Sequence, residues 1–469
     1  MRRKFLYIYS LSVLGLLSLQ SCFVAKDYKQ PDIVQETVDE DLYRTDNLAT
    51  DSLSMADLSW KDIFKDPILQ DYIDEGLNNN LDIRIALQQI NAAESYLKQG
   101  KAGYFPTIGA QAEGMHQKFS KNTTTGAMQS SMDQFELSAG LSWEADIWGK
   151  IRSGKRAAEA GYLQSVAAHQ AVKSKLVSAI ASTYYQLITL DEQIAATERT
   201  LETRRNSLET TKALKDAGRI TEVAVKQTEA QVYNAEGLLV DLKSNAKLLE
   251  NTLSILLGSG PREIVRGTMD AEAIDSPLQL GVPSQLLSNR PDLRAAEFGL
   301  IAAFENTNIT RSQFYPSLTI NANGGLQSME IKDLFNANSL FAGVIGGLTQ
   351  PILQGRRIRT QHEVAKADQE SAKLNFMYTF LNASKEVSDA MYRINAAEEK
   401  IIIKEKEYDA LAKAVEYSQE LLNYGLADYL EVLRAEENAL FTNISLIESQ
   451  NEKLQSTIEL YRALGGGWN

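Results

Sequence analysis

The chain contains the same sequence unit twice. Leu81-Asp82-Ile83-Arg84 is repeated as Pro291-Asp292-Leu293-Arg294 after 210 positions, and Leu257-Gly258 is repeated as Leu464-Gly465 after 207 positions. Because the offset hardly changes over most of the chain, it indicates one duplicated structural unit. A repeat of this kind must be settled before a fold class is assigned, because each copy folds as the same supersecondary unit.

Other matched positions lie between these two pairs and divide the chain into segments. Length alone suggests about three domains of roughly 150 residues, but the duplication overrides that estimate. The matched positions are Tyr104-Phe105-Pro106 with Phe314-Tyr315-Pro316, Gly149 with Gly355, Gly218 with Gly425, and Glu229 with Glu436. We predict an export signal at 1–21, an acidic N-terminal segment at 22–59, a first repeat at 60–258, a connection at 259–283 and a second repeat at 284–469.

The first 21 residues have the features of an export signal. Three basic residues at positions 2–4 precede an apolar run that ends at Leu19, which is too short and too close to the N-terminus to predict a membrane span. Leu19-Gln20-Ser21-Cys22 resembles the lipobox of bacterial lipoproteins, which implies cleavage after Ser21 and a covalent lipid on Cys22. The alternative is cleavage elsewhere, with Cys22 as an incidental thiol. Cys22 is the only cysteine, so an intrachain disulfide is excluded.

The charge of the chain narrows the choice of partners. The formal net charge is −13, and removal of 1–21 takes away three basic residues and no acidic one. A strongly acidic chain argues against nucleic acids and anionic lipid surfaces as partners. The segment from Phe23 to Leu58 is acidic and lacks periodic apolar residues, so we expect it to lie along the surface or to be partly disordered.

Two segments in each repeat alternate apolar and polar residues. The clearest runs from Phe135 to Ile147, with small or polar residues on its second face; the others are at 108–113, 318–323 and 340–348, and polar loops at 118–133 and 327–339 join each pair. This alternation is typical of transmembrane barrel strands. An amphipathic hairpin on a soluble core is the alternative, but the small polar face and the nearby Trp143 and Trp148 favour the membrane interpretation.

Four strands cannot close a barrel by themselves. Open sheet edges are not tolerated in the hydrocarbon core of a membrane, because their backbone groups would have no hydrogen-bond partners. If these strands span the membrane, several chains must share one barrel. Three chains would supply twelve strands.

The remaining sequence predicts helices that are too long for a globular domain. Between Lys150 and Ala217 only glycines near the start interrupt the helical pattern, and a continuous helix of that length extends on the order of 100 Å. Leu374 to Tyr424 is a comparable stretch, and apolar positions from Leu440 to Tyr461 step alternately by four and three, as in a coiled coil. Gly218 and Gly425 suit left-handed caps between paired helices. A plain antiparallel coiled coil would explain these helices but not the strands or the duplication.

Several motifs together resemble one known family. They are Asn289-Arg290-Pro291-Asp292-Leu293-Arg294, the two Phe/Tyr-Pro positions before the strands, Gln354-Gly355-Arg356, Gly425-Leu426-Ala427-Asp428-Tyr429-Leu430, and Ala463-Leu464-Gly465-Gly466-Gly467-Trp468. From about Trp60 to Trp468 the chain resembles the lipoprotein outer membrane factors, the TolC-like outer membrane channels of efflux systems that contain resistance-nodulation-division pumps.

The resemblance implies a mixed fold class, all-α together with transmembrane β. The expected molecule is a homotrimer with a twelve-stranded barrel in the bacterial outer membrane, continued by a periplasmic tunnel of twelve helices. An equatorial region is expected from Trp60 to Asn80, from Gly258 to Pro283 and at the C-terminus. The expected partners are outer membrane lipid, a periplasmic adaptor and an inner-membrane pump. The implied function is an exit duct that passes small molecules such as drugs or toxic metals.

The resemblance also implies where the duct closes. By position in the motif, the pore gate would consist of Asp428, Leu430, Arg434 and Glu437. We expect Asp428 and Leu430 to project into the pore and the other two to tie neighbouring helices, with basic and acidic residues in the reverse of the family's usual order. The alternative is that Asp428 only caps the returning helix. The expected adaptor contacts are the turns at the helix tips, Gly218, Arg219, Gly425 and Leu426.

No pattern in the sequence predicts catalysis. The three histidines, His116, His169 and His362, are isolated in sequence, no cluster has metal-ligand spacing, and the glycine runs do not follow a phosphate-loop pattern. We therefore expect no enzyme and no cofactor apart from lipid on Cys22. Two other functions remain open: a periplasmic adaptor lipoprotein, which would have one hairpin and no duplication, and a type I secretion duct, which exports proteins.

Overall fold

The computed structural model describes residues 24–31, 54–268 and 285–468. The export signal, Cys22 and much of the connection at 259–283 lie outside these residues, so the predictions for them remain predictions. Contacts divide the chain into two units. The strand unit contains residues up to 31, 90–165 and 296–376, and the hairpin unit contains 32–89, 166–295 and 377–469.

The duplication seen in the sequence is confirmed by elements of equal length. Helices α5 (Leu81–Ala102) and α10 (Pro291–Ser312) have 22 residues each, strands β1 (Thr107–Lys118) and β3 (Ser317–Ser328) have 12, and helices α7 (Lys150–Asp216) and α11 (Arg357–Asn423) have 67. Helices α8 (Glu222–Leu256) and α12 (Tyr429–Leu464) complete the two copies with 35 and 36 residues. Helix α11 begins well before Leu374, where the sequence pattern placed it.

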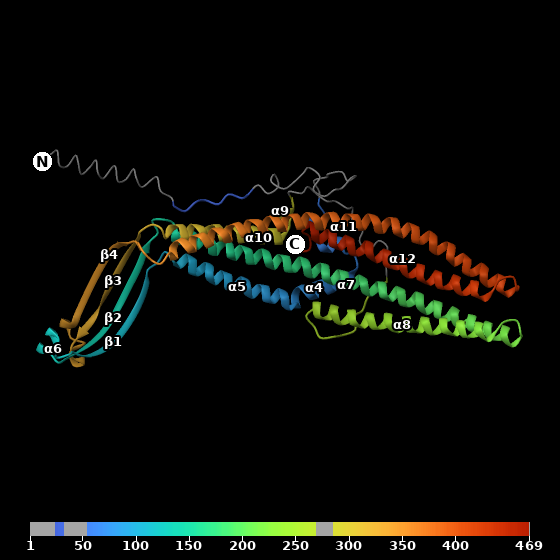
Figure 1. Ribbon diagram of the computed structural model, residues 1–469, viewed down its shortest axis with the longest axis horizontal. Helices are drawn as coiled ribbons and strands as arrows, with labels where there is room; N and C mark the ends of the chain where they lie inside the picture. The colour runs from blue at the N-terminus through green and yellow to red at the C-terminus, as the bar shows by residue number, and fades with distance from the viewer. Residues whose placement is uncertain (1–23, 32–53, 269–284, 469) are drawn as a thin grey trace. The chain divides into compact units, whose positions relative to one another are not determined.

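The four strands form one antiparallel sheet in the order β1-β2-β3-β4 (Figure 1). Strand β2 covers Ser131–Ala145 and β4 covers Leu340–Thr349. Their register keeps the predicted apolar positions on one face: Leu141 lies opposite Ile108 in β1 and opposite Ala322 in β3, and Leu348 lies opposite Leu318. Phe341 and Ile345 of β4 lie on the other face. Apart from these two residues, the predicted alternation is continuous across the whole sheet.

The second face of the sheet carries a layer of polar contacts. Ser142 Oγ donates to Asn321 Oδ1 at 2.8 Å, and Gln327 Nε2 donates to Glu136 Oε2 at 3.4 Å, in each case between β2 and β3. Both pairs lie directly opposite each other in the register, which is the arrangement in which cross-strand side chains stabilise a sheet. The polar face is thus internally hydrogen-bonded and suited to contact with water.

The ends of the strands differ slightly from the sequence prediction. Strand β2 ends at Ala145, so Ile147 lies beyond it, and the two loops contain helix α6 (Thr124–Met128) and the 3₁₀ turns Ile331–Asp333 and Ala337–Ser339. At the end of the sheet where the helices begin, the indoles of Trp143 and Trp148 donate to backbone carbonyls of Tyr104 and Pro316. Aromatic side chains with one polar end are characteristic of membrane interfaces.

The described part of the N-terminal segment is only partly packed: most of 26–31 lies exposed, as expected, whereas residues before and after it are buried. In the strand unit, Val24 and Ala25 are buried, and the Asn308 amide bonds the Lys26 backbone twice, at 3.1 Å to its N–H and 2.9 Å to its carbonyl. In the hairpin unit, Met55 within the 3₁₀ turn Met55–Asp57 is fully buried. The segment at 24–31 forms neither helix nor strand and is held by individual contacts, so no periodicity marks it in the sequence.

The hairpin unit is built around the two long helical hairpins. Helices α3 (Trp60–Ile63), α4 (Pro67–Asn79) and α9 (Leu286–Asn289) pack near the bases of the hairpins. The fully buried side chains of this unit include Ile73, Ile180, Tyr184, Phe380 and Tyr461, which come from four helices. In each hairpin the two helices run side by side (Figure 1).

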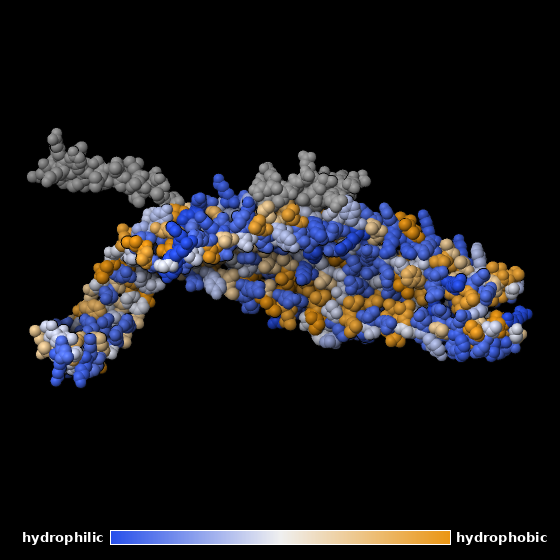
Figure 2. Space-filling view, in the orientation of Figure 1, coloured by the Kyte–Doolittle hydropathy of each residue, from blue (hydrophilic) through white to orange (hydrophobic). Residues whose placement is uncertain are grey.

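Hydrophilic and hydrophobic residues are interspersed along the helices on the face shown in Figure 2. Helix α8 carries four exposed hydrophobic side chains at steps of seven and eight residues: Tyr233, Val240, Leu248 and Ile255. A spacing of this kind forms a stripe along one side of a helix. Among the described helices, none is both long and apolar enough to cross a membrane.

Candidate functional site: hairpin tips and their support

The turn between α7 and α8 is closed by a glycine cap. Gly218 has a φ of +71°, and the N–H of Arg219 donates to the carbonyl of Leu214 at 2.9 Å while that of Gly218 donates to Lys215 at 2.8 Å. These two bonds form a Schellman motif, which requires a residue with positive φ and therefore favours glycine. The predicted cap is confirmed, and Gly218 and Arg219 are exposed at the tip.

The turn between α11 and α12 has the same geometry. Gly425 has a φ of +72°, and the N–H of Leu426 donates to the carbonyl of Leu421 at 2.9 Å. Leu426 is 75% exposed. Asp428 is the N-cap of α12, and its Oδ1 accepts a hydrogen bond from the N–H of Leu430 at 3.4 Å. The capping role of Asp428, which was the alternative from sequence, is therefore present.

The other predicted gate residues lie on one exposed side of α12. Leu430, Arg434 and Glu437 are spaced by four and three residues and are all exposed, whereas Val432 and Glu436 are buried. Within the described chain Arg434 and Glu437 form no ion pair. The structure thus places the three side chains where a neighbouring surface could meet them, and the ties predicted for Arg434 and Glu437 remain a prediction.

A polar cleft of about 260 Å³ lies between the two hairpins near their tips. Hydroxyl and amide side chains predominate in its lining, and the hydroxyl of Tyr429 on α12 donates to Gln227 on α8 across the hairpins. The lining residues are Thr203, Asn206, Ser207, Thr210, Thr211, Thr228, Gln419, Leu422, Asn423, Tyr429, Val432 and Leu433. Water-compatible surface therefore separates the hairpins at the end that carries the predicted gate.

A buried carboxyl next to this cleft was missed by the sequence interpretation. Glu436 is only 4% exposed, and its burial raises the pKa of its carboxyl despite hydrogen bonds from Ser207 and Gln419. Arg204, also buried, has its pKa lowered by burial. A signal for Glu436 was available, because it lies four residues before Leu440, the first position of the predicted coiled-coil seam.

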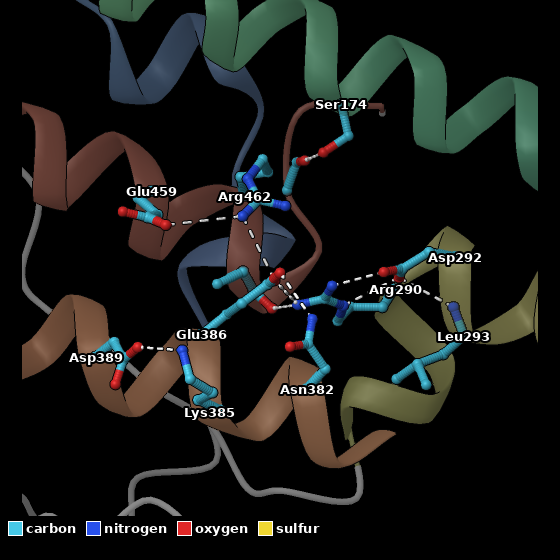
Figure 3. Close-up of polar contacts among 12 residues, drawn as sticks. Ser174, Arg290, Asp292, Leu293, Asn382, Lys385, Glu386, Asp389, Glu459 and Arg462 are labelled. Carbon is cyan, nitrogen blue, oxygen red and sulfur yellow. Dashed lines mark hydrogen bonds and ion pairs between the residues drawn. The ribbon is translucent and has the colours of Figure 1, made fainter. Parts of the chain in front are cut away.

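The two most specific family motifs pack against each other at the bases of the hairpins. Gly465 has a φ of +104°, and a Cβ there would lie 2.5 Å from the carbonyl oxygen of Asn289. The indole Nε1 of Trp468 donates to the same carbonyl at 3.1 Å. Ser174 Oγ on α7 donates to the carbonyl of Gly466 at 2.5 Å (Figure 3). Gly465 is therefore required by close backbone approach, and Gly466 leaves room for the ring of Tyr461.

Arg290 is the centre of this contact (Figure 3). Its guanidinium donates to the carbonyl of Ala463 at 2.8 Å, to Glu386 on α11 at 2.8 Å, and to Asp292 at 2.6 and 3.0 Å. Arg290 is 3% exposed. Glu386 also lies 3.4 Å from Arg462 on α12. One buried cation thereby joins the start of α10, the middle of α11 and the end of α12.

The charges in this cluster support each other. Burial alone would raise the pKa of Asp292, but the hydrogen bonds and charge of Arg290 outweigh it, so the pKa lies below its usual value of 3.8. An acid with a depressed pKa stabilises the folded state above the unfolded pKa, and this contribution is lost as the pH falls through the folded pKa. The cluster therefore contributes fully at neutral pH.

The equatorial region implied by the family resemblance is assembled in the same way. Tyr461 Oη donates to the carbonyl of Leu58 at 2.9 Å, and Tyr72 Oη donates to the carbonyl of Val265 at 2.9 Å. Arg266 bridges Asp191 and the buried Glu250, the latter at 2.8 Å. Segments from 58–80, 258–268 and the C-terminus thus contact the hairpin bases.

No group of three or more His, Cys, Asp or Glu side chains among the described residues could hold a metal ion. His116 lies 2.5 Å from Asp133 across β1 and β2, and His362 lies 3.0 Å from Thr310. His169 has its pKa lowered by burial and by Lys173. The three histidines occupy separate places in the strand and hairpin units.

Comparison with known proteins agrees with this architecture. The outer membrane efflux protein family matches the chain twice, over 72–259 and 282–466. The solvent efflux pump outer membrane protein SrpC of Pseudomonas putida is 27% identical over 462 residues, 98% of each chain. The cation efflux system protein CusC of Escherichia coli K12 is 26% identical over 453 residues, 96% of this chain and 97% of that one.

Solved structures show the same fold. A crystal structure of CusC has a TM-score of 0.84 at 25% identity and covers 95% of this chain and 100% of that chain. The open state of the MtrE outer membrane channel of Neisseria gonorrhoeae has a TM-score of 0.84 at 24% identity, with 96% and 99% covered.

The duplicated strand-and-hairpin unit defines a channel protein of the bacterial outer membrane with a large periplasmic helical part. The chain belongs to the outer membrane efflux protein family. It is an outer membrane exit duct of an efflux system, and the family resemblance stated from sequence is confirmed.

We expect Arg290→Met to destabilise the folded protein by about 3–5 kcal/mol, because it leaves the carboxylates of a buried charge cluster without their partner. The matched control is Arg393→Met, which breaks the exposed ion pair to Glu459 at 3.0 Å and should cost less than about 1 kcal/mol. Thermal unfolding of the detergent-purified proteins, followed by circular dichroism, measures both. Equal, small losses would contradict the central role of Arg290.

Proposed function

We propose that the chain is the homotrimeric exit duct of a tripartite efflux pump and that it passes small molecules from the periplasm to the exterior without catalysing a reaction. The observation that carries this proposal is the sheet of four strands with two open edges, joined to helical hairpins in a duplicated unit. Unpaired strand edges are not stable in a bilayer. Three copies would close twelve strands.

The exposed stripe on α8 supports the same assembly. Tyr233, Val240, Leu248 and Ile255 are each more than 60% exposed in the single chain. Side chains at near-heptad spacing bury well against a neighbouring helix. In the proposed trimer, α8 of one copy packs against a helix of the next, and the helices form a continuous tunnel.

The duplication sets the register at the junction between copies. Within the chain, Leu141 of β2 pairs with Ala322 of β3. Leu141 pairs with Ile108 of β1, and Leu348 pairs with Leu318 of β3, which is the equivalent of Ile108 in the second repeat. Leu348 of β4 is therefore the equivalent of Leu141. Ala112 of β1 is equivalent to Ala322, 210 residues later. If β4 pairs with β1 of the next copy as β2 pairs with β3, Leu348 lies opposite Ala112.

We therefore expect the double variant Ala112→Cys, Leu348→Cys to form disulfide-linked trimers in membranes under mild oxidation, as seen on non-reducing gels. Directly opposed strand residues have the separation that a disulfide requires. Replacing Val344 instead of Leu348 moves the thiol about 13 Å along the strand, so that control should not cross-link. Cross-linking of neither pair, or of the control alone, would contradict the shared barrel in this register.

The hairpin tips are the proposed contact with the periplasmic adaptor. Gly218, Arg219, Gly425 and Leu426 are exposed, and both turns are held rigidly by their Schellman bonds. A rigid, exposed turn is suited to a partner, because little conformational entropy is lost on binding. The inner-membrane pump would contact the duct through the adaptor or at these same tips.

The exposed side of α12 is the proposed pore gate. Asp428, Leu430, Arg434 and Glu437 follow the second glycine cap, and the last three lie on one side of the helix. In a trimer, three copies of Asp428 form an acidic ring that favours cations. Leu430 narrows the pore, and Arg434 and Glu437 tie neighbouring helices.

Single-channel conductance in planar bilayers tests this gate. Asp428→Asn keeps the helix cap but removes the charge, so it should reduce the preference for cations. The double variant Leu430→Ser, Arg434→Ser should raise conductance several-fold, because it widens the pore and removes a contact between neighbouring helices. The control is Val223→Ser, the equivalent of Leu430 in the first repeat, which should have little effect. If the gate variants conduct like the wild type as intact trimers, the gate does not lie at this turn.

A lipid on Cys22 is the proposed second attachment to the outer membrane. Ala25 lies against Gly149, where a Cβ would come within 2.9 Å, just after the end of β2. Cys22 is three residues before Ala25, so the chain can place it at most about 11 Å away. A lipid there would enter the membrane close to the strand ends.

Mass spectrometry of the mature N-terminus should find Cys22 as the first residue, carrying acyl chains. Because lipid chains add only reversible membrane affinity, Cys22→Ala should still be found in the outer membrane through its strands, and it serves as the unlipidated mass control. An unmodified cysteine, or an N-terminus at another residue, would contradict the anchor.

The proposed cargo is small and varied. Relatives are named for solvents, toluene, cations and antibiotics. A type I secretion duct is the remaining alternative, and the lipobox and the Gly465-Gly466-Gly467-Trp468 terminus favour small-molecule efflux. A periplasmic adaptor would carry one hairpin, whereas this chain carries two.

A further inference from the structure

Glu436 and Glu229 occupy the same position in the two repeats but have opposite surroundings. Glu229 on α8 is half-buried, with its side chain 29% exposed, and Lys226 pairs with it at 2.8 Å and lowers its pKa. Glu436 on α12 is 4% exposed. The duplication places Glu229 and Glu436 at equivalent positions on their helices. In the second repeat, however, neighbouring helices bury the carboxyl of Glu436.

Glu436 connects helices of both repeats. Its Oε1 accepts a hydrogen bond from Ser207 Oγ on α7 at 3.0 Å and another from Gln419 Nε2 on α11 at 3.1 Å. Its Oε2 is buried without a hydrogen-bond partner among the described residues. A buried carboxylate with an unpaired oxygen is costly in its charged form, so this position is sensitive to protonation.

The charged group that acts on Glu436 is Arg204. Arg204 is 2% exposed on α7, and its Nη1 donates to the carbonyl of Gln231 on α8 at 2.8 Å. It acts electrostatically on both Glu436 and the neighbouring Glu437, but within the described chain it forms no ion pair with Glu436. Helices α8 and α11 contribute uncharged amides to this cluster, Gln231 and Gln419.

We propose that Glu436 is a proton-controlled contact between the two hairpins, which holds them together when protonated and loosens them when charged. Helix α12 would then be free to move against α7 when the carboxyl loses its proton. This proposal rests on the gate proposed at the tip of α12, and it adds that the protonation of Glu436 regulates the opening of that gate. We call the cluster of Glu436, Ser207, Gln419 and Arg204 the Glu436 contact.

Thermodynamic linkage gives the direction of the effect. Burial raises the pKa of Glu436, and the hydrogen bonds and Arg204 offset only part of that shift. The buried arrangement therefore binds the proton more tightly than a hydrated carboxyl would, so acid favours the Glu436 contact and rising pH weakens it. Because the ordinary pKa of this carboxyl is 4.5, the change takes place above that value.

The position of the contact suits control of the gate. Glu436 lies eight residues after Asp428, which is roughly 12 Å along the helix. Ser207 and Gln419, its two hydrogen-bond donors, also line the polar cleft between the hairpins. Water in this cleft would give protons access to the carboxyl without unfolding either hairpin.

The test is single-channel recording of the intact trimer with the periplasmic side held between pH 5.5 and 7.5. The wild type should open more often as the pH rises, by roughly ten-fold for one unit of pKa difference between the two arrangements. Glu436→Gln imitates the protonated group and should remain mostly closed at every pH. The matched control, Glu229→Gln, should titrate like the wild type.

A second measurement needs no variant. Hydrogen exchange of the wild-type segments 200–212 and 430–440, corrected for the intrinsic effect of pH, should show greater protection at pH 5.5 than at pH 7.5. Unchanged protection, or a Glu436→Gln channel that titrates like the wild type, would overturn the proposal. If Leu430→Ser, Arg434→Ser still raises conductance in that case, the gate stands and only its proton control is wrong.

Discussion

The buried guanidinium of Arg290 holds the base of the second hairpin, α11 and α12, in place, and the position of that hairpin's tip depends on it. A long helical hairpin amplifies any change of angle at its base, so its tip is only as well placed as its support. Arg290 bonds Asp292, Glu386 and the Ala463 carbonyl, which belong to three helices. Multiple charge-assisted hydrogen bonds with fixed geometry offset the desolvation of a buried charge. The adjacent Gly465 and Trp468 then close the C-terminus onto the same loop.

The duplication explains why the two repeats have the same elements, and it shows at which equivalent positions their side chains differ. Helices α5 and α10, strands β1 and β3, and helices α7 and α11 have equal lengths and give equivalent positions, yet equivalent residues differ where the repeats meet. Asn80 caps α5 by accepting hydrogen bonds from Asp82 and Ile83 at 2.8 and 3.2 Å, whereas Arg290 at the equivalent position joins three helices. Likewise Glu229 is half-buried and paired with Lys226, whereas Glu436 is buried and has no ion pair within the described chain. Both repeats thus keep the same backbone, and their side chains differ where the first repeat contacts the second.

Several features were predictable because they depend on local sequence. The positive φ values of Gly218 and Gly425 follow from helix ends that only glycine caps well, and the alternation around Leu141 fixes one apolar face whatever the strands pair with. Helix α11 was predicted too short because residues 357–373 are rich in charged side chains, which hide the apolar periodicity. The packing of Val24 and Ala25 could not be predicted, because a segment without helix or strand that is held by Asn308 leaves no period in the sequence.

The sequence by itself determined the repeat, the order and type of the elements, the glycine caps and the family, because these depend on periodicity and on residues with special backbone conformations. It also identified Asp428, Leu430, Arg434 and Glu437 as close neighbours that follow the second glycine cap. Only the tertiary structure decided which charged groups are internal. Glu436 and Arg290 are ordinary surface residues by composition, and they become buried because helices distant in sequence converge on them. The spacing of Glu436 from Leu440 could indicate that it lies on the buried side of its helix, but the partners of both residues come from distant helices, so no local pattern could assign them.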